Sequence, residues 1–185
     1  MQEDAESSVL DERKGTVMDA PVENTRLEAQ AVTAENFRPF GVVLHALEDG
    51  TPFTAEEAAL DVSEGTPRFY LMTLRDKPLE FTRITRHLHT TQTLMSVGGA
   101  EWFIAVAPAG DLSDAGIPRQ EDIRAFAIPG DVAITMNKGT WHSGPYFHED
   151  ELSFVNLELS DTNVVDHHTY RLDRELNVRV VIDPA

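Results

Sequence analysis

Two histidines and a glutamine lie close together in residues 85–94, which read TRHLHTTQTL. On a strand, side chains two positions apart point to the same face, so His87 and His89 are expected to face one side. Imidazole nitrogen binds Zn, Fe, Mn, Ni and Cu, and it also exchanges protons near neutral pH. Gln92 has the opposite parity and joins the histidines only if a bulge or turn near 90–91 intervenes. The stretch predicts a metal pair, an acid–base site, or two partly buried histidines that simply hydrogen-bond inside a barrel.

A second stretch with chemical side chains reads PGDVAITMNKGTWHSGPYF and spans residues 129–147. Its opening Pro-Gly-Asp is typical of a tight turn that enters a strand. A further turn, NKGT, then delivers Trp141 and His142. An aromatic ring beside a histidine after a turn indicates a pocket wall. The alternative for Trp141 is an ordinary core or interface aromatic.

Short β-rich runs make up most of the chain that must position these residues. Many short strands at spacings near ten residues, separated by turns, predict an all-β sandwich or barrel. The sequence lacks the alternating βα pattern, the Gly-rich phosphate loop and the Gly-x-Ser-x-Gly elbow of other enzyme classes. The runs cover residues 68–74, 79–88, 91–97, 101–108, 123–129, 131–137, 152–159 and 178–182.

The N-terminal part of the chain divides into two regions. Residues 1–26 are polar and charged, which predicts a flexible acidic tail in front of a folded domain at 27–185. Residues 27–31 alternate apolar and polar, as in a short strand. Thr33 then has the position of a helix N-cap, with Asn36 at the third helical position.

Composition restricts the possible partners and ligands. At 185 residues the chain fits one domain, and its net charge of -17 argues against nucleic acid and anionic membranes as partners. The absence of cysteine excludes thiolate metal sites and cysteine nucleophiles, so a metal would need His, Asp, Glu or Gln ligands. No apolar run approaches about 20 residues, and the acidic N-terminus is unlike a signal peptide. We therefore expect a cytoplasmic protein.

Together the two stretches resemble the conserved segments of the cupin superfamily. The first segment of that superfamily carries His-x-His and then a Glu, and the second carries a Pro-x-Gly turn and a His. Gly130, Gly139 and His142 fit the second segment loosely. In the first, the Glu position falls at Thr93 or Leu94, neither of which is a metal ligand.

A closer resemblance is to the ureidoglycolate lyase family. Residues 27–183 are similar to it through three groups of positions, which are Arg86, His87 and Gln92, then Gly139, Trp141 and His142, and finally Asn163. The early run AENFRPFGVVL also resembles the opening of the family. His89 stands where the family usually has no histidine. The resemblance implies an all-β fold, a cupin-type double-stranded β-helix or jelly-roll barrel with a few short helices.

The resemblance also implies a reaction, the cleavage of a carbinolamine carbon–nitrogen bond in ureidoglycolate to give glyoxylate and urea. No cofactor is required on this reading. We expect His87 and His142 to act as base and acid and Gln92 to donate a hydrogen bond to a substrate oxygen. Four residues are candidates for contact with the anionic substrate: Arg83, Lys138, Trp141 and His89. Arg83 is chosen for its strand parity with His87, a parity that Arg86 lacks.

Two other interpretations stay open. A metal-dependent cupin enzyme would use His87, His89 and His142 to hold a divalent Zn, Fe, Mn or Ni ion, with Gln92, Glu101 or Glu158 completing the shell. It would act on a small carboxylate as a lyase, isomerase or dioxygenase. A non-catalytic cupin that binds a small ligand is the third interpretation. On any of them a homodimer is expected, and His148, His167 and His168 are expected to lie on the surface.

Overall fold

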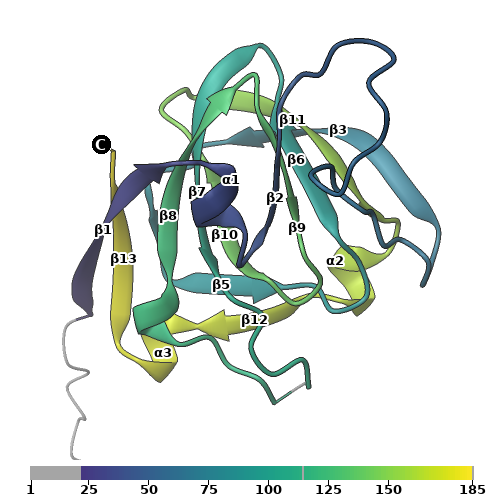
Figure 1. Cartoon of the computed structure of the whole chain (residues 1–185). Helices are drawn as coiled ribbons and strands as arrows, with labels where there is room; N and C mark the ends of the chain where they lie inside the picture. The colour runs from purple at the N-terminus through teal and green to yellow at the C-terminus, as the bar shows by residue number, and fades with distance from the viewer. Residues whose placement is uncertain (1–21, 114, 185) are drawn as a thin grey trace, which may run out of the picture.

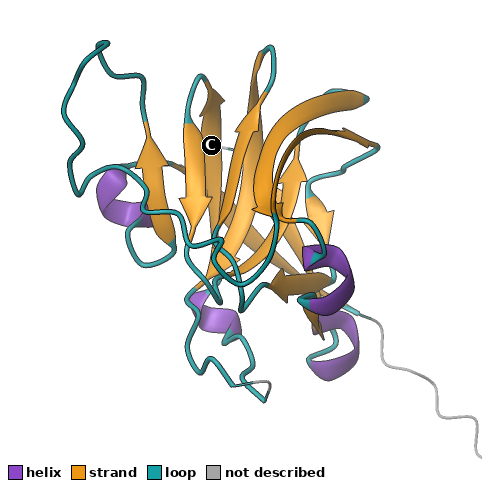
Figure 2. Cartoon of the chain, turned by 90° about the vertical axis from the view of Figure 1, so that its right-hand side faces the viewer, coloured by secondary structure: helices purple, strands orange, loops and turns teal. Residues whose placement is uncertain are grey.

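The computed structural model describes residues 22–113 and 115–184, and these form two curled sheets that face each other (Figure 1). The larger sheet has eight strands in the order β12-β5-β10-β7-β8-β1-β13-β4, and the smaller has five in the order β2-β9-β6-β11-β3. The expected all-β jelly-roll fold with a few short helices is confirmed. Figure 2 shows those helices at the ends of strands rather than between the sheets.

Strands of the larger sheet come from every part of the described chain. Their bounds are β1 Glu23–Ala31, β4 Glu80–Phe81, β5 Arg83–Arg86, β7 Gly99–Ala107, β8 Arg124–Gly130, β10 Trp141–Tyr146, β12 His168–Arg171 and β13 Val178–Asp183. Strand β1 pairs in parallel with both β13 and β8, so the first and last strands lie side by side. Most other pairs in this sheet are antiparallel.

The smaller sheet is antiparallel throughout its described pairs. Its strands are β2 Gly41–Leu44, β3 Pro67–Arg75, β6 Gln92–Ser96, β9 Ala133–Met136 and β11 Glu151–Leu159. The short helices are α1 Ala34–Phe37, α2 Thr162–Val165 and α3 Leu172–Glu175, with a 3₁₀ turn at Gln120–Asp122. In the described part of the chain, none of the helices has the length and hydrophobicity of a membrane-spanning segment.

Two hydrophobic cores explain why some strands are apolar along their whole length. The first core fills the barrel and contains Trp102, Phe126 and Phe154, and the second contains Phe103 and Trp141. Strand β7 contributes to both cores, so its residues 102–107 are all buried. A strand buried on both faces reads as a continuous apolar run, and this is how residues 102–107 appear in the sequence.

The predicted N-cap of the first helix is confirmed. The Asn36 backbone N–H donates to Thr33 Oγ1 at 3.1 Å, and the Thr33 N–H donates to Asn36 Oδ1 at 2.8 Å. This reciprocal pair satisfies two backbone donors at the helix start. The helix lies between β1 and β2, where the chain passes from one sheet to the other.

Three sequence predictions need correction. The strand expected over 79–88 is broken, because β4 ends at Phe81, β5 ends at Arg86, and residues 87–91 form the connection to β6. No strand is predicted between residues 137 and 152, but β10 covers Trp141–Tyr146, directly after the NKGT turn. The predicted tail at 1–26 is too long, since β1 begins at Glu23; residues 1–21 lie outside the described part of the chain.

Candidate active site

The fold brings together the three residues predicted as catalytic. His87, Gln92 and His142 line one small pocket with Thr90, Met136, Asn137 and Thr140. The ring centroids of His87 and His142 are 5.0 Å apart. His87 comes from the connection after β5, Gln92 begins β6, and His142 lies on β10, so both sheets contribute to the pocket.

His87 is held by Asp166, which follows α2 and is 79 positions away in the sequence. His87 Nδ1 lies 2.6 Å from the backbone carbonyl oxygen of Asp166. The Asp166 carboxylate accepts the backbone N–H groups of Leu88 at 2.7 Å and of His89 at 2.8 Å, which fixes the bend after β5. A carbonyl oxygen can only accept, so Nδ1 of the ring carries the proton and the neutral ring has its lone pair on Nε2.

His142 is held in the same tautomer. Its Nδ1 lies 3.2 Å from the Thr140 carbonyl oxygen, which again leaves the lone pair of the neutral ring on Nε2. The turn before it is tied to the first histidine, because the Gly139 N–H donates to the His87 carbonyl at 2.6 Å. Gly139 has φ 79°, and a Cβ there would collide with Leu112, so this turn requires glycine.

The electrostatic surroundings keep both rings neutral at neutral pH. Burial lowers the pKa of His142 to about 3, with a further contribution from the neighbouring His87. Burial also lowers the pKa of His87, although the hydrogen bond and charge of Asp166 act in the opposite direction. The two rings therefore act as proton acceptors toward a ligand. His87 is the better of the two at holding a proton, because Asp166 supports its charged form.

Gln92 presents an acceptor to the pocket rather than a donor. Its Nε2 donates to Glu158 Oε2 at 2.9 Å, and it lies 3.4 Å from Asn156 Oδ1. The Glu158 oxygen accepts from the amide nitrogen, so this bond fixes which way the amide points. The buried Oε1 of Gln92 has no hydrogen-bond partner among the described residues. The expectation that Gln92 donates to the substrate is therefore wrong, because its donor is already engaged.

Glu158 is the centre of the network behind Gln92. It is 1% exposed, and its Oε1 accepts from the Tyr70 hydroxyl at 3.1 Å and from Asn163 Nδ2 at 3.3 Å. Asn156 Nδ2 donates to the same Tyr70 hydroxyl at 3.1 Å. This network orients Gln92. Asn163, which matched the family resemblance, thus lies behind the pocket and not on its wall.

Trp141 does not line the pocket. Neighbouring residues on a strand face opposite sides, so when His142 points into the barrel Trp141 points away from it. Its ring is 2% exposed and packs in the second core, with the Arg86 guanidinium carbon 4.6 Å from the ring centroid. The expectation of a substrate-binding tryptophan is corrected to a core residue.

Neither arginine of β5 lines the pocket. Arg83 is exposed, since it alternates with the buried Ile84, and the structure does not bring it to His87. Arg86 is 0% exposed, and its guanidinium donates to the carbonyl oxygens of Asp111, at 2.5 Å, and of Ser113. The parity argument fails because the strand ends at Arg86, before either histidine.

His89 and Lys138 do not line the pocket but contact acidic residues of the connection between β2 and β3. His89 Nδ1 lies 2.6 Å from Glu64 Oε2, and half of its side chain is exposed. Lys138 Nζ lies 2.8 Å from Asp61 Oδ2 and 2.7 Å from Glu64 Oε1. Hydrogen bonds to these carboxylates raise the pKa of Lys138, and the hydrogen bond to Glu64 raises that of His89.

The ligand set of the metal-dependent interpretation does not fit this geometry. His89 is turned toward Glu64, Glu101 is exposed on β7, and Glu158 is occupied by its own donors. Within residues 22–113 and 115–184, no group of three or more His, Asp or Glu side chains is arranged to hold a metal ion. Of the three predicted histidines the structure brings together His87 and His142, while His89 is turned toward Glu64, and the metal-dependent interpretation stays a prediction.

His167 lies closer to the pocket than its surface assignment implies. The residue is exposed, yet its ring centroid is 5.7 Å from that of His87. Two polar residues inside the barrel also belong to the site: Asn156, which was not predicted, and Glu158, which was predicted only as a possible metal ligand. Asn156 and Glu158 share strand parity with the core residue Phe154, and two polar side chains on the inner face of an apolar strand are the signal that could have identified them.

Comparison with known proteins finds a matching family and several similar chains. A family model described as ureidoglycolate lyase matches residues 24–179. The chain is 26% identical over 164 residues to the ureidoglycolate lyase of Pseudomonas fluorescens strain Pf0-1, covering 81% of this chain and 95% of that protein. It is 25% identical over 171 residues to the ureidoglycolate lyase of Pseudomonas syringae pv. tomato, covering 85% and 95%.

Similar solved structures are more distant. An oxalate decarboxylase from Bacillus subtilis has a TM-score of 0.38 and 13% identity, covering 60% of this chain and 25% of that one. RmlC from Streptococcus suis has a TM-score of 0.35 and 13% identity, covering 68% and 53%. At this level of similarity neither protein informs the reaction. The family match over residues 24–179 is decisive by itself, and the chain belongs to the ureidoglycolate lyase family.

Proposed function

We propose that this enzyme cleaves the carbon–nitrogen bond of the carbinolamine in ureidoglycolate, releasing glyoxylate and urea. Family membership supports a lyase of this kind. The observation that carries the proposal is the unpartnered, buried Oε1 of Gln92 beside two neutral histidines. Such a pocket offers acceptors, and a ureido carbinolamine has matching O–H and N–H donors. A buried acceptor without a partner is costly, so a ligand donor is the natural complement.

One proton has to move from the hydroxyl oxygen to the departing nitrogen. His87 Nε2 accepts the hydroxyl proton while the carbonyl of glyoxylate forms. The carbon–nitrogen bond breaks with its electron pair on nitrogen, and the His87 imidazolium returns the proton there to give urea. The Asp166 carbonyl, 2.6 Å from Nδ1, stabilises the transient charge on the ring.

In this scheme His142 does not act as the general acid that was predicted from the sequence. With a pKa of about 3, its ring does not carry a second proton at neutral pH. It accepts a hydrogen bond from the substrate and, with Gln92 Oε1, holds the ureido N–H groups so that the nitrogen stays near His87. The two rings thus divide proton transfer and positioning between them.

The substrate carboxylate needs a donor or a cation. Lys138 remains our proposal for this role, because it follows Asn137 of the pocket wall directly in the chain. Its Nζ is already engaged by Asp61 and Glu64, so the carboxylate would have to take their place.

The reaction changes no oxidation state overall and requires no cofactor. We expect the enzyme to work in the cytoplasm as a homodimer.

Glyoxylate release from ureidoglycolate tests this function. The purified enzyme, prepared without a histidine tag, is expected to release glyoxylate and urea in equal amounts at an unchanged rate after treatment with a chelator. Metal content measured on the same sample should be far below one ion per chain. Absence of turnover would remove this substrate, whereas turnover that is lost with the chelator and restored by Zn, Mn, Fe or Ni would establish the metal-dependent alternative.

The pH dependence of kcat/KM follows from the lowered pKa values. The working form of both rings is neutral, and the pKa of each lies below the ordinary histidine value of 6.5. We therefore expect activity to persist as pH falls through 6.5 and to be lost only at a lower pH, as His87 becomes protonated. The same sign applies to folding. Unfolded histidines take up protons below 6.5, so the contribution of these rings to stability is lost as pH falls.

A pH profile measured together with the melting temperature at each pH separates these effects. An acid limb of kcat/KM at or above 6.5, in protein that is still folded, would contradict neutral, buried catalytic rings.

A further inference from the structure

A third histidine ring lies beside the two that line the pocket. The ring centroid of His167 is 5.7 Å from that of His87, which is in turn 5.0 Å from that of His142. His87 is 5% exposed, whereas His167 is an exposed residue. The row of three rings therefore leads from the pocket to the surface, and His167 lies at its outer end.

The backbone holds His167 in this place. It follows Asp166 directly, and the carbonyl oxygen of Asp166 lies 2.6 Å from Nδ1 of His87. The next residue, His168, begins β12, and its Nε2 lies 3.6 Å from Oδ1 of Asp166. Of these two neighbouring histidines, one therefore pairs with an acid and the other lies against the ring of His87.

His167 can donate a hydrogen bond to a ligand. Its Nδ1 lies 3.3 Å from Thr169 Oγ1, and that oxygen lies 3.0 Å from Thr85 Oγ1. The Thr169 hydroxyl can accept from Nδ1 while it donates to Thr85, so both ring nitrogens of a charged His167 can carry protons. Within residues 22–113 and 115–184 the histidine ion pairs are those of His89 and His168, so no carboxylate of that part occupies His167.

The polarity of the pocket determines which end of a ureido carboxylate enters first. The buried Oε1 of Gln92 and the Nε2 of neutral His142 are acceptors, which match the N–H groups of the ureido end. A carboxylate also only accepts, so it has no partner at these atoms. The reacting carbon, which lies next to His87 in the scheme above, carries the carboxylate directly. The carboxylate is therefore expected to point toward the surface, on the side of His167.

Lys138 is less open to this carboxylate than His167. Its Nζ lies 2.8 Å from Asp61 Oδ2 and 2.7 Å from Glu64 Oε1, so two protein carboxylates already take the place of a ligand. A contact with Lys138 needs at least one of these ion pairs to break. A contact with His167 breaks none among the described residues.

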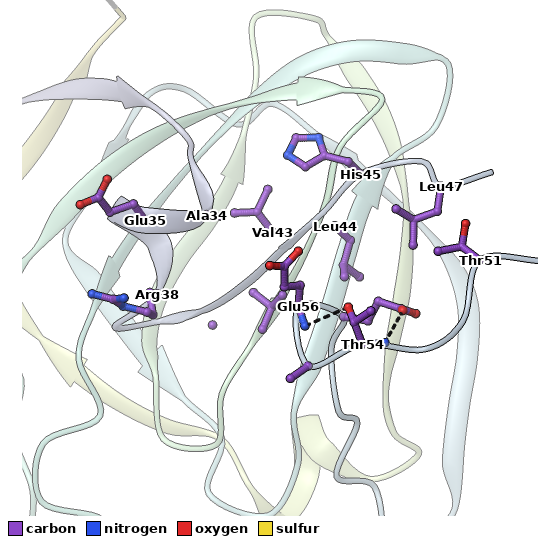
Figure 3. Close-up of a pocket in the computed structure, with 14 residues that line it drawn as sticks. Ala34, Glu35, Arg38, Val43, Leu44, His45, Leu47, Thr51, Thr54 and Glu56 are labelled. Carbon is purple, nitrogen blue, oxygen red and sulfur yellow. Dashed lines mark hydrogen bonds between the residues drawn. The ribbon is translucent and has the colours of Figure 1, made fainter.

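A larger groove beside β2 does not offer a second place for the carboxylate. It has a volume of about 680 Å³, and Arg38 lines it together with Glu35, Glu56 and Glu57. Figure 3 shows Glu35, Arg38 and Glu56 around this groove. None of the described residues that line it also lines the histidine pocket, so a small substrate held at His87 does not extend into it.

We propose, on the basis of the proposed function, that His167 donates a hydrogen bond to the carboxylate of the substrate. It thereby selects ureido carboxylates over uncharged ureido compounds. A protein of net charge -17 repels an anion, so a cationic donor at the outer end of the row of rings is where an anionic substrate gains most. His87 and His142 then act on the carbinolamine, while His167 holds the other end of the molecule.

Two ureido compounds that cannot undergo the elimination test this selectivity. Oxalurate has the ureido group and the carboxylate of ureidoglycolate but a carbonyl in place of the carbinol, and acetylurea has a methyl group in place of that carboxylate. The methyl signal of Met136, which lines the pocket, reports binding in protein with labelled methionine methyl groups. We expect the wild type to bind oxalurate more tightly than acetylurea. His167→Ala should weaken oxalurate binding about tenfold or more and leave acetylurea binding unchanged.

The matched control is His148→Ala, because His148 is also exposed and lies in the turn between β10 and β11. This variant should bind both compounds as the wild type does, and His167→Lys, which keeps a cation, should recover part of the oxalurate affinity. A wild type without preference for oxalurate, unchanged oxalurate binding in His167→Ala, or equal losses for both compounds would overturn the proposal. If the wild type shows the expected difference but releases no glyoxylate from ureidoglycolate, the carboxylate site stands and the proposed reaction is wrong.

Discussion

Replacing His87 with alanine is expected to lower kcat by about 10²–10⁴-fold, the range for loss of one positioned proton-transfer group. The His87 side chain is 5% exposed and lines the pocket, where its Nε2 lone pair is the proton acceptor that Asp166 best supports. His142→Ala should lose less in kcat and more in KM, because that ring holds the substrate and does not carry the proton. Steady-state rates of glyoxylate release for the two variants measure this difference.

The matched control for the His87 variant is His148→Ala, because His148 lies in the turn between β10 and β11 and does not line the pocket. This variant should retain the wild-type kcat. Equal losses of kcat in His87→Ala and His142→Ala would contradict the division of tasks between the rings. Full activity in His87→Ala would remove His87 as the proton carrier and leave the reaction itself intact.

The fold was predictable because its signals are local. The runs that became β3, β6, β7, β8, β9, β11 and β13 alternate or are continuously apolar, and turn residues separate them. The helix cap at Thr33 depends on a residue three positions away. Strand β10 was missed because Gly144 and Pro145 lie within it and read as turn residues, although pairing with β7 and β5 keeps them in a strand.

The site was predictable only in part, because its orientation depends on distant residues. His87, Gln92 and His142 could be identified as a set from their types and from the family resemblance. The direction of the Gln92 amide could not, since it is fixed by Glu158, 66 positions away. The same holds for His89, whose ring turns to Glu64 because the strand has already ended. Strand parity gives a side-chain direction only within a strand.

Replacing Glu158 with alanine is expected to lower both stability and substrate binding. The substitution leaves buried donors of Gln92 and Tyr70 without their acceptor, at a cost of about 1–3 kcal/mol for each unsatisfied group. It also frees the Gln92 amide to rotate, so Oε1 is no longer held toward the substrate. We expect a lower free energy of unfolding, measured in urea, together with a raised KM for ureidoglycolate.

Two further variants separate positioning from folding. Glu158→Gln keeps an oxygen that can accept from Gln92 Nε2, so it should recover much of the KM even if Tyr70 and Asn163 lose part of their bonding. Gln92→Leu removes the pocket acceptor and should raise KM as Glu158→Ala does. If Glu158→Ala lowers stability but leaves KM unchanged, Gln92 is not oriented by Glu158, and the acceptor role of Oε1 in substrate binding is wrong. The KM of these variants, more than their stability, therefore decides whether this buried network serves the reaction.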